Sequence, residues 1–385
     1  MNWHSRGMAI TPGGSQTFSR MHGKMGPRTF PSTATHAEGA YIWDVDGNRY
    51  IDLAGANASA PLGFNHPRVV QAVRDELGRG GTLSLPTQIE VEASEAMIET
   101  VPFGDMVRWV RTGSEAVSGA IRTARHVTGK ELVVRFDGSY HGWHPWTDCH
   151  YTLASVEPEE IEESAFDYLD AAAVLVEPPR MNAITREYID WLRTLRRECT
   201  EHGVALIYDD VVFGFRFNKM GLLGETKVAP DMACFSKALG NGVPVGCFVG
   251  REEWMRDTPV SSTFGGETTG LAAAKAVLEI HREQDVCANL RAIGTKLRNA
   301  LQIALNGSCV SLEGMPVHFR FNAEPAVLDT FLTACVQRGV LIHRAANNAS
   351  LALTQARRND ICEVVRVAAQ EAGAIHGRQQ EIRSH

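Results

Sequence analysis

The sequence predicts an α/β protein: a large domain with a mainly parallel sheet flanked by helices, and a smaller α+β domain built from both chain ends. Strand-length apolar runs alternate with helical patterns at 132–136, 172–178, 204–210 and 232–236. Such alternation is typical of a parallel sheet, and continuously apolar runs are typical of strands covered on both faces. Beyond about residue 285 the pattern changes to a long helical stretch, short strands and a last helix. The chemistry is expected where the central strands end.

Three segments follow from these patterns. Residues 1–60 form an irregular arm, rich in Gly, Pro, Ser and Thr, and part of the small domain; AYIWDVDGNRYIDL within them is typical of a hairpin turning at Asp46-Gly47. Residues 61–285 form the large domain, starting with a helix at 67–78, and residues 286–385 form the C-terminal small domain.

Composition narrows the class of function. The net charge is −7 without a Lys/Arg-rich run, which argues against nucleic acid and anionic membranes as partners. No apolar stretch reaches the roughly 20 residues that span a bilayer, and the N-terminus lacks a signal-peptide core, so we expect a cytoplasmic protein. The cysteines are scattered without a CxxC pair, so neither a metal site nor disulfides are expected. A small-molecule partner remains.

A lysine and an aspartate each come at the end of a predicted strand, one crossover apart. Asp209 ends an apolar run, where a carboxylate needs a cationic partner such as a protonated pyridine nitrogen. Val211 would then pack on the ring. Lys237 follows MACFS and could serve as amine nucleophile and proton carrier. Two alternatives stay open: a metal-binding pair of Asp209 and Asp210, and a lysine whose stem reaches water.

Two further segments add candidate ligands for a flat, phosphorylated cofactor. In RTGSEAVSGAIRTAR, Gly113 and Ser114 precede a helix, where free amides, the helix dipole and a hydroxyl could bind a phosphate. Ser114 as a simple helix cap is the alternative. FDGSYHGWHPW follows a strand and brings Tyr140 and Trp143 to the same edge, where an aromatic ring could stack on the cofactor. Packing of Trp143 onto the core is the other interpretation.

Taken together, these segments resemble the class III pyridoxal 5'-phosphate (PLP) dependent aminotransferases of fold type I, and most closely their glutamate-1-semialdehyde aminomutase-like subgroup. The landmarks run in order through nearly the whole chain: PGGSQTFSR, GAYIWDVDGNRYIDL, LGFNHPRVVQAV, TGSEA, GSYHG, VLVEPP, YDDVVFGFR, PDMACFSKALGNGVPVG and STFGGET. Several motifs in order are more specific than any one of them.

The resemblance implies PLP as the cofactor, with PMP as its aminated form. It implies that Lys237 forms the internal aldimine and that Asp209 pairs with the pyridinium nitrogen. By the same resemblance, Val211 and Tyr140 sandwich the ring, and residues 113–114 hold the phosphate.

The resemblance also implies a homodimer with shared active sites, because Thr263 in STFGG looks like the family's threonine that reaches the neighbouring subunit's phosphate. Arg20 falls where the aminomutase-like enzymes place an arginine on the substrate carboxylate; an arginine that ties down the arm is the alternative. Trp143 and Glu177 are the other expected substrate contacts.

Departures from the family pattern leave the substrate open. Asp210 stands where a glutamate is usual, Phe213 where a threonine is usual, and GGET replaces an Asn-Pro-containing segment. The stretch from His141 to Glu177 is shorter than in relatives, which predicts a more open substrate entrance.

The sequence therefore predicts a transaminase that moves an amino group from a donor to a carbonyl compound through Lys237 and PMP. An aminomutase, racemase or decarboxylase on the same scaffold is the alternative. A non-catalytic sensor with the same fold is a remote one.

Overall fold

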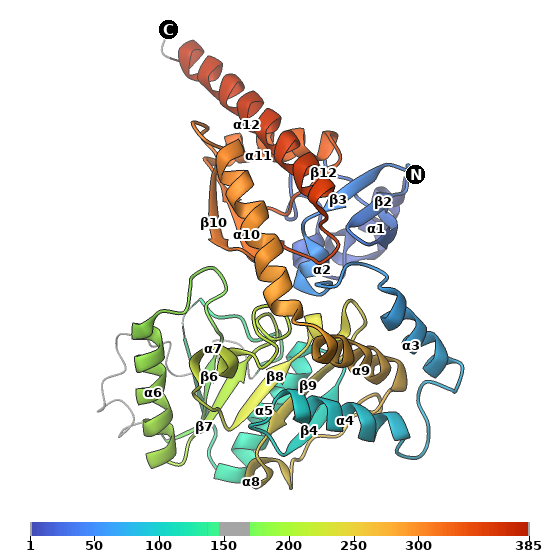
Figure 1. The fold of residues 1–385 in the computed structure, drawn as a ribbon, viewed down its shortest axis with the longest axis vertical. Helices are drawn as coiled ribbons and strands as arrows, with labels where there is room; N and C mark the ends of the chain where they lie inside the picture. Colours follow the sequence, from blue (N-terminus) through green and yellow to red (C-terminus); the bar gives the residue numbers. More distant parts are fainter. Residues whose placement is uncertain (1, 137, 146–169, 384–385) are drawn as a thin grey trace. The chain divides into compact units, whose positions relative to one another are not determined.

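The computed structural model of the protein describes residues 2–136, 138–145 and 170–383. The expected short stretch between His141 and Glu177 therefore lies largely outside the described residues. The chain divides into two compact units: residues 67–287, and residues 1–66 with 288–385. Figure 1 colours them along the sequence, so that the second unit combines blue and orange-to-red segments.

The unit of residues 67–287 is built on a sheet with the strand order β4-β9-β8-β7-β6-β5. Its strands are β4 (Met106–Val110), β5 (Leu132–Arg135), β6 (Ala171–Val176), β7 (Ala205–Asp209), β8 (Met232–Phe235) and β9 (Gly246–Gly250). Strands β5 to β8 pair in parallel, while β9 is antiparallel to both β8 and β4. Strand β4 therefore runs in the same direction as β5 to β8, and the carboxyl ends of all these strands meet at one edge. The predicted α/β class with a mainly parallel sheet is confirmed.

Helices cover both faces of this sheet. They are α3 (Pro67–Leu77), α4 (Gln88–Thr100), α5 (Gly113–Thr128), α6 (Arg186–Glu201), α7 (Leu222–Thr226), α8 (Glu252–Met255) and α9 (Thr268–Glu283). Alternate residues of a strand point to opposite faces. Leu175 and Ile207 pack in the cluster that contains α5, whereas Val174 and Leu206 pack in the cluster that contains α4, α6 and α9. Both faces are thus apolar, which explains the unbroken apolar runs.

The second unit joins the two ends of the chain. The strands β1 (Ala34–Glu38), β2 (Tyr41–Asp44), β3 (Arg49–Asp52) and β12 (Val340–Leu341) form one sheet, in which β3 and β12 pair in parallel. The strands β10 (Ser311–Met315), β11 (His318–Asn322) and β13 (Asn347–Asn348) form another. Its helices are α1 (Trp3–Ile10), α2 (Gly55–Ala58), α10 (Val286–Ala304), α11 (Pro325–Gln337) and α12 (Gln355–Arg383). The predicted hairpin is confirmed, with Gly47 at φ 83° in its turn.

Within the described ranges, no helix combines the length and the apolar character needed to cross a membrane.

His281 on α9 makes part of the stability of this protein depend on pH. Its ring is buried edge-on against Phe215 at 5.4 Å, and Nε2 has no hydrogen-bond partner among the described residues. Burial lowers the pKa of His281 from 6.5 to about 4. Between these values the unfolded chain takes up a proton that the folded protein refuses, so stability is complete above pH 6.5 and falls as the pH drops toward 4. The slope is at most about 1.4 kcal/mol per pH unit.

We expect the stability of His281→Leu to fall less than that of the wild type between pH 7 and pH 4.5. The urea midpoint of unfolding at each pH measures this loss. His126→Gln is the matched control, because His126 lies exposed near the end of α5. The other titratable groups are the same in each variant, so their contributions to the pH dependence of stability cancel in the comparison. If His281→Leu lost as much stability as the wild type over this pH range, His281 would not be the source of the pH dependence.

Candidate active site

A cavity of about 190 Å³ opens at the edge where the parallel strands end. Each strand contributes through the residues that follow it: Gly113 after β4, Tyr140 after β5, Glu177 after β6, Asp209 at the end of β7 and Lys237 after β8. The residues that line it are Gly113, Ser114, Val117, Tyr140, His141, Gly142, Glu177, Asp209, Val211, Val212, Ser236 and Lys237. Most of the predicted site residues are thereby brought together within one unit.

Lys237 occupies a strained and largely buried position. Its φ of 44° is in the left-handed region, which a lysine adopts only when the surroundings enforce it. Burial is the largest influence on its pKa and lowers it, while the Asp209 carboxylate opposes that shift. An amine that loses its proton more readily is a better nucleophile and base.

Asp209 is buried and held in one orientation. The Nδ1 of His141 donates to Asp209 Oδ2 at 2.8 Å, and the amide of Val211 donates to Oδ1 at 3.2 Å. The ring of His141 is itself buried, with Nε2 lacking a partner among the described residues. The sequence reasoning missed this role for His141, although its place directly after Tyr140 in GSYHG was a usable signal.

The neighbouring Asp210 does not share the cavity. Its Oδ1 accepts a hydrogen bond from the amide of Leu222 at 2.9 Å, and burial raises its pKa well above the usual range. Burial disfavours the charged carboxylate that metal ions bind, and Asp210 is absent from the cavity lining, so it is a poor metal ligand. The alternative of a metal-binding Asp209–Asp210 pair is therefore not supported.

The start of α5 offers two amides to an anion. Thr112 caps this helix, because its Oγ1 accepts from the amide of Glu115 at 3.2 Å, so the interpretation of Ser114 as the cap is wrong. The amides of Gly113 and Ser114 have no acceptor among the described residues, and both residues line the cavity. A helix N-terminus with free amides is an anion site.

Close approaches narrow the space around this helix start. Gly142 has a φ of +102°, and a Cβ there would lie 2.6 Å from Ser114 Oγ. A Cβ on Gly113 would lie 2.7 Å from Val211 Cγ1, so Val211 closes directly on the helix start. A phosphate at the amides, a ring beside Val211 and a pyridine nitrogen at Asp209 fit this arrangement.

Trp143 and Thr263, both predicted site residues, are not among those lining this cavity. The side chain of Trp143 is 75% exposed, and its ring meets His144 edge-on at 4.7 Å. Thr263 is exposed as well. Tyr140 does line the cavity, although it is 58% exposed. These positions leave the dimer role of Thr263 as a prediction.

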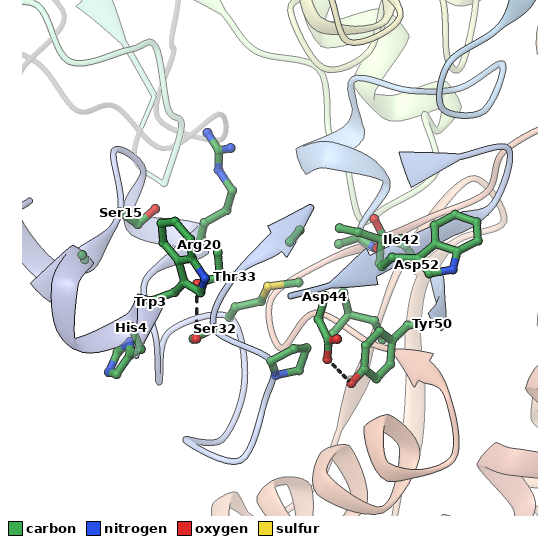
Figure 2. Close-up of a pocket in the computed structure, with 18 of the residues that line it drawn as sticks. Trp3, His4, Ser15, Arg20, Ser32, Thr33, Ile42, Asp44, Tyr50 and Asp52 are labelled. Atoms are coloured by element: carbon green, nitrogen blue, oxygen red, sulfur yellow. Dashed lines mark hydrogen bonds between the residues drawn. The ribbon is translucent and has the colours of Figure 1, made fainter. Parts of the chain in front are cut away.

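Arg20 lines a different pocket, of about 630 Å³, in the unit formed by the chain ends. Figure 2 shows Arg20 there among other residues of the N-terminal arm, with the hydrogen-bonded Asp44 and Tyr50 also lining the pocket. Its guanidinium donates to Thr17 Oγ1 at 2.8 Å, which is a contact within the arm. Other residues tie the arm down: the carbonyl of Ser19 lies 2.9 Å from Nε2 of His343, and the carbonyl of Met25 accepts from the amide of Arg344 at 2.8 Å. The alternative interpretation of Arg20 as the residue that fastens the arm is therefore not supported.

The comparison with protein families decides the assignment. The model of the class-III aminotransferases matches residues 24–168 and 147–356. This chain belongs to the class-III aminotransferase family. A glutamate-1-semialdehyde 2,1-aminomutase of Bordetella avium is 36% identical over 282 residues, covering 65% of this chain and 66% of the relative. Another from Syntrophobacter fumaroxidans is 33% identical over 341 residues, covering 80% and 76%. The predicted aminomutase-like subgroup is confirmed.

Solved structures share the fold over nearly the whole chain. The PLP internal aldimine form of the FumI protein of Sphingopyxis sp. MTA144 matches with a TM-score of 0.86 and 27% identity, covering 96% of this chain and 95% of that one. A β-phenylalanine aminotransferase of Variovorax paradoxus matches with a TM-score of 0.82 and 23% identity, covering 96% and 93%. The family and the neighbouring PLP-containing structure support the predicted cofactor, pyridoxal phosphate.

Proposed function

We propose that this protein is a PLP-dependent enzyme that relocates an amino group within one small molecule, as an aminomutase does. The convergence of Lys237 and Asp209 on one cavity supports amino-group chemistry on PLP. The 33% to 36% identity to glutamate-1-semialdehyde aminomutases favours this reaction over the transaminase that the sequence pattern alone suggested. Transfer of the amino group between two molecules is the second candidate function. It is retained because Asp210 and Phe213 depart from the family pattern and leave the substrate open.

The proposed roles of the residues follow from their environment. The cofactor supplies an aldehyde that takes up the amino group and a ring that withdraws electrons from the reacting carbon. Lys237, with its lowered pKa, attaches the cofactor and then moves the proton at that carbon. Asp209 keeps the pyridine nitrogen protonated, and His141 holds Asp209 in place. The amides of Gly113 and Ser114 bind the phosphate.

Product analysis tests the proposal. Purified, PLP-loaded protein is incubated with glutamate-1-semialdehyde, with and without an added 2-oxo acid. For an aminomutase we expect the amino group to move from C2 to C1 without the oxo acid, and no amino acid to form from it. Formation of product only when the oxo acid is consumed would assign the reaction to the transaminases instead.

We also propose a homodimer, in which Thr263 of each subunit approaches the other subunit's phosphate site. The support is the family to which the chain belongs together with the exposure of this residue.

A further inference from the structure

Arg180 lies outside the predicted site and follows β6 and the VLVEPP landmark. Arg180 forms an ion pair with Glu177, one of the residues that line the cavity. The side chain of Arg180 is 32% exposed, whereas that of Glu177 is only 7% exposed. The arginine therefore lies on the solvent side of a buried carboxylate at the cavity.

One edge of the Arg180 guanidinium is already in use. Its Nε lies 3.1 Å from Glu177 Oε1, and its Nη2 donates to Oε2 at 3.3 Å. The remaining edge consists of Nη1 and the second N–H of Nη2, and it has no acceptor among the described residues. A guanidinium edge with two parallel N–H groups matches a carboxylate in a bidentate geometry.

Glu177 is fixed firmly enough to serve as the support for this arginine. Its Oε2 also accepts the amide of Tyr140 at 3.0 Å. Burial and the nearby Asp209 raise the pKa of Glu177, while Arg180 opposes that shift. Arg180 thus stabilises the charged form of Glu177 and is in turn oriented by it.

The charge of Arg180 also acts on the catalytic amine. It contributes to the lowered pKa of Lys237, after the larger influences of burial and Asp209. Arg216 acts in the same direction, but it is fully buried, so no substrate reaches it from solvent. Of these two arginines, Arg180 is therefore the one that is partly exposed, and its ion pair with Glu177 holds it beside a residue of the cavity lining.

We propose that the free edge of Arg180 binds the carboxylate of the substrate, so that the enzyme acts on amino compounds that carry a carboxylate away from the reacting carbon. The inference rests on the proposed amino-group chemistry at Lys237, and it names the substrate class for that site. It places the residue that contacts the substrate carboxylate within residues 67–287, as an alternative to the predicted role of Arg20.

Glutarate binding to PLP-loaded protein tests this without turnover, because the loaded cofactor keeps the dianion away from the amides of Gly113 and Ser114. We expect glutarate, but not the uncharged glutaramide, to bind the wild type in isothermal titration. Arg180→Gln should weaken glutarate at least roughly tenfold, with partial recovery in Arg180→Lys. Arg186→Gln, which removes a solvent-exposed arginine, is the matched control. Failure of glutarate to bind the wild type, or equal binding by Arg180→Gln, would overturn the proposal.

Glu177→Gln distinguishes two roles of Arg180: binding of the substrate carboxylate, or only an ion pair that holds Glu177 in place. If Arg180 serves only to hold Glu177, both variants lose glutarate equally. If Arg180 is the receptor, Glu177→Gln keeps the guanidinium and leaves the glutamine oxygen as an acceptor for the Tyr140 amide, so glutarate binding should weaken much less than in Arg180→Gln.

Experiments with amine donors distinguish a failure of the Arg180 role from a failure of the proposed function. Conversion of bound cofactor by 5-aminopentanoate and by pentylamine is followed by absorbance in each variant. Arg180→Gln should raise the apparent KM for 5-aminopentanoate about tenfold more than the apparent KM for pentylamine, because any effect of Arg180 on Lys237 acts on both donors alike. The protein could bind glutarate through Arg180 and yet convert neither the amine donors nor glutamate-1-semialdehyde. That result would refute the proposed reaction but leave Arg180 as the residue that binds the carboxylate. Donor conversion with an unchanged KM in Arg180→Gln would refute the receptor alone.

Discussion

Lys237→Ala is expected to lower turnover by roughly 10³-fold or more and to abolish covalent attachment of the cofactor, because one buried amine performs both attachment and proton transfer. Borohydride reduction followed by mass spectrometry of the intact chain measures attachment: the wild type should gain the mass of reduced PLP, and the variant should not. Turnover is measured with the substrate that the product analysis identifies.

Lys227→Ala provides the matched control. Lys227 also has a left-handed backbone, with a φ of 60°, and its ammonium donates to the carbonyl of Gly224 at 2.8 Å, away from the cavity. This variant should keep both the reducible cofactor and the turnover. A reducible adduct that persists in Lys237→Ala would place the attachment on another residue and remove the basis of the proposed function.

The central sheet was predictable because its parallel strands are buried on both faces. A short apolar run such as AAAVLV in β6, repeated in alternation with helical patterns, is typical of a strand between two layers of helices. The strands β4 and β9 were not predicted. In β9 the reason is a glycine: a Cβ on Gly246 would lie 2.7 Å from the carbonyl oxygen of Thr112, so close packing excludes the β-branched residues that mark a strand. In β4, MVRWV, exposed residues interrupt the apolar pattern.

The cavity was predictable to the extent that its residues follow predicted strands. Asp209 and Lys237 end neighbouring parallel strands, so their meeting follows from topology. The pairs His141–Asp209 and Arg180–Glu177 depend instead on how loops fold back over the strand ends, and no periodic pattern encodes that. The same limit applies to Thr112, because a capping box is visible in TGSE only after the helix start is known.

Asp209→Asn is expected to lower turnover by roughly 10²-fold to 10⁴-fold while leaving attachment of the cofactor to Lys237 intact. An amide is neutral and presents one acceptor instead of two, so it cannot keep a pyridine nitrogen protonated and also accept from His141. Reduction with borohydride should still label Asp209→Asn, because attachment uses the aldehyde and Lys237 alone. This difference in readout distinguishes the aspartate from the lysine.

Asp210→Asn is the control that makes the test specific, since it makes the same chemical change one residue along the chain. Burial raises the pKa of Asp210 well above its usual range, which favours the neutral acid, and an asparagine oxygen can still accept from the amide of Leu222. The substitution therefore removes little charge and should change turnover by less than about threefold. Similar losses in both variants would mean that local folding, and not the charge of Asp209, limits the reaction. A large loss confined to Asp209→Asn would tie the reaction to the carboxylate that His141 orients, and His141→Phe should then reproduce part of it.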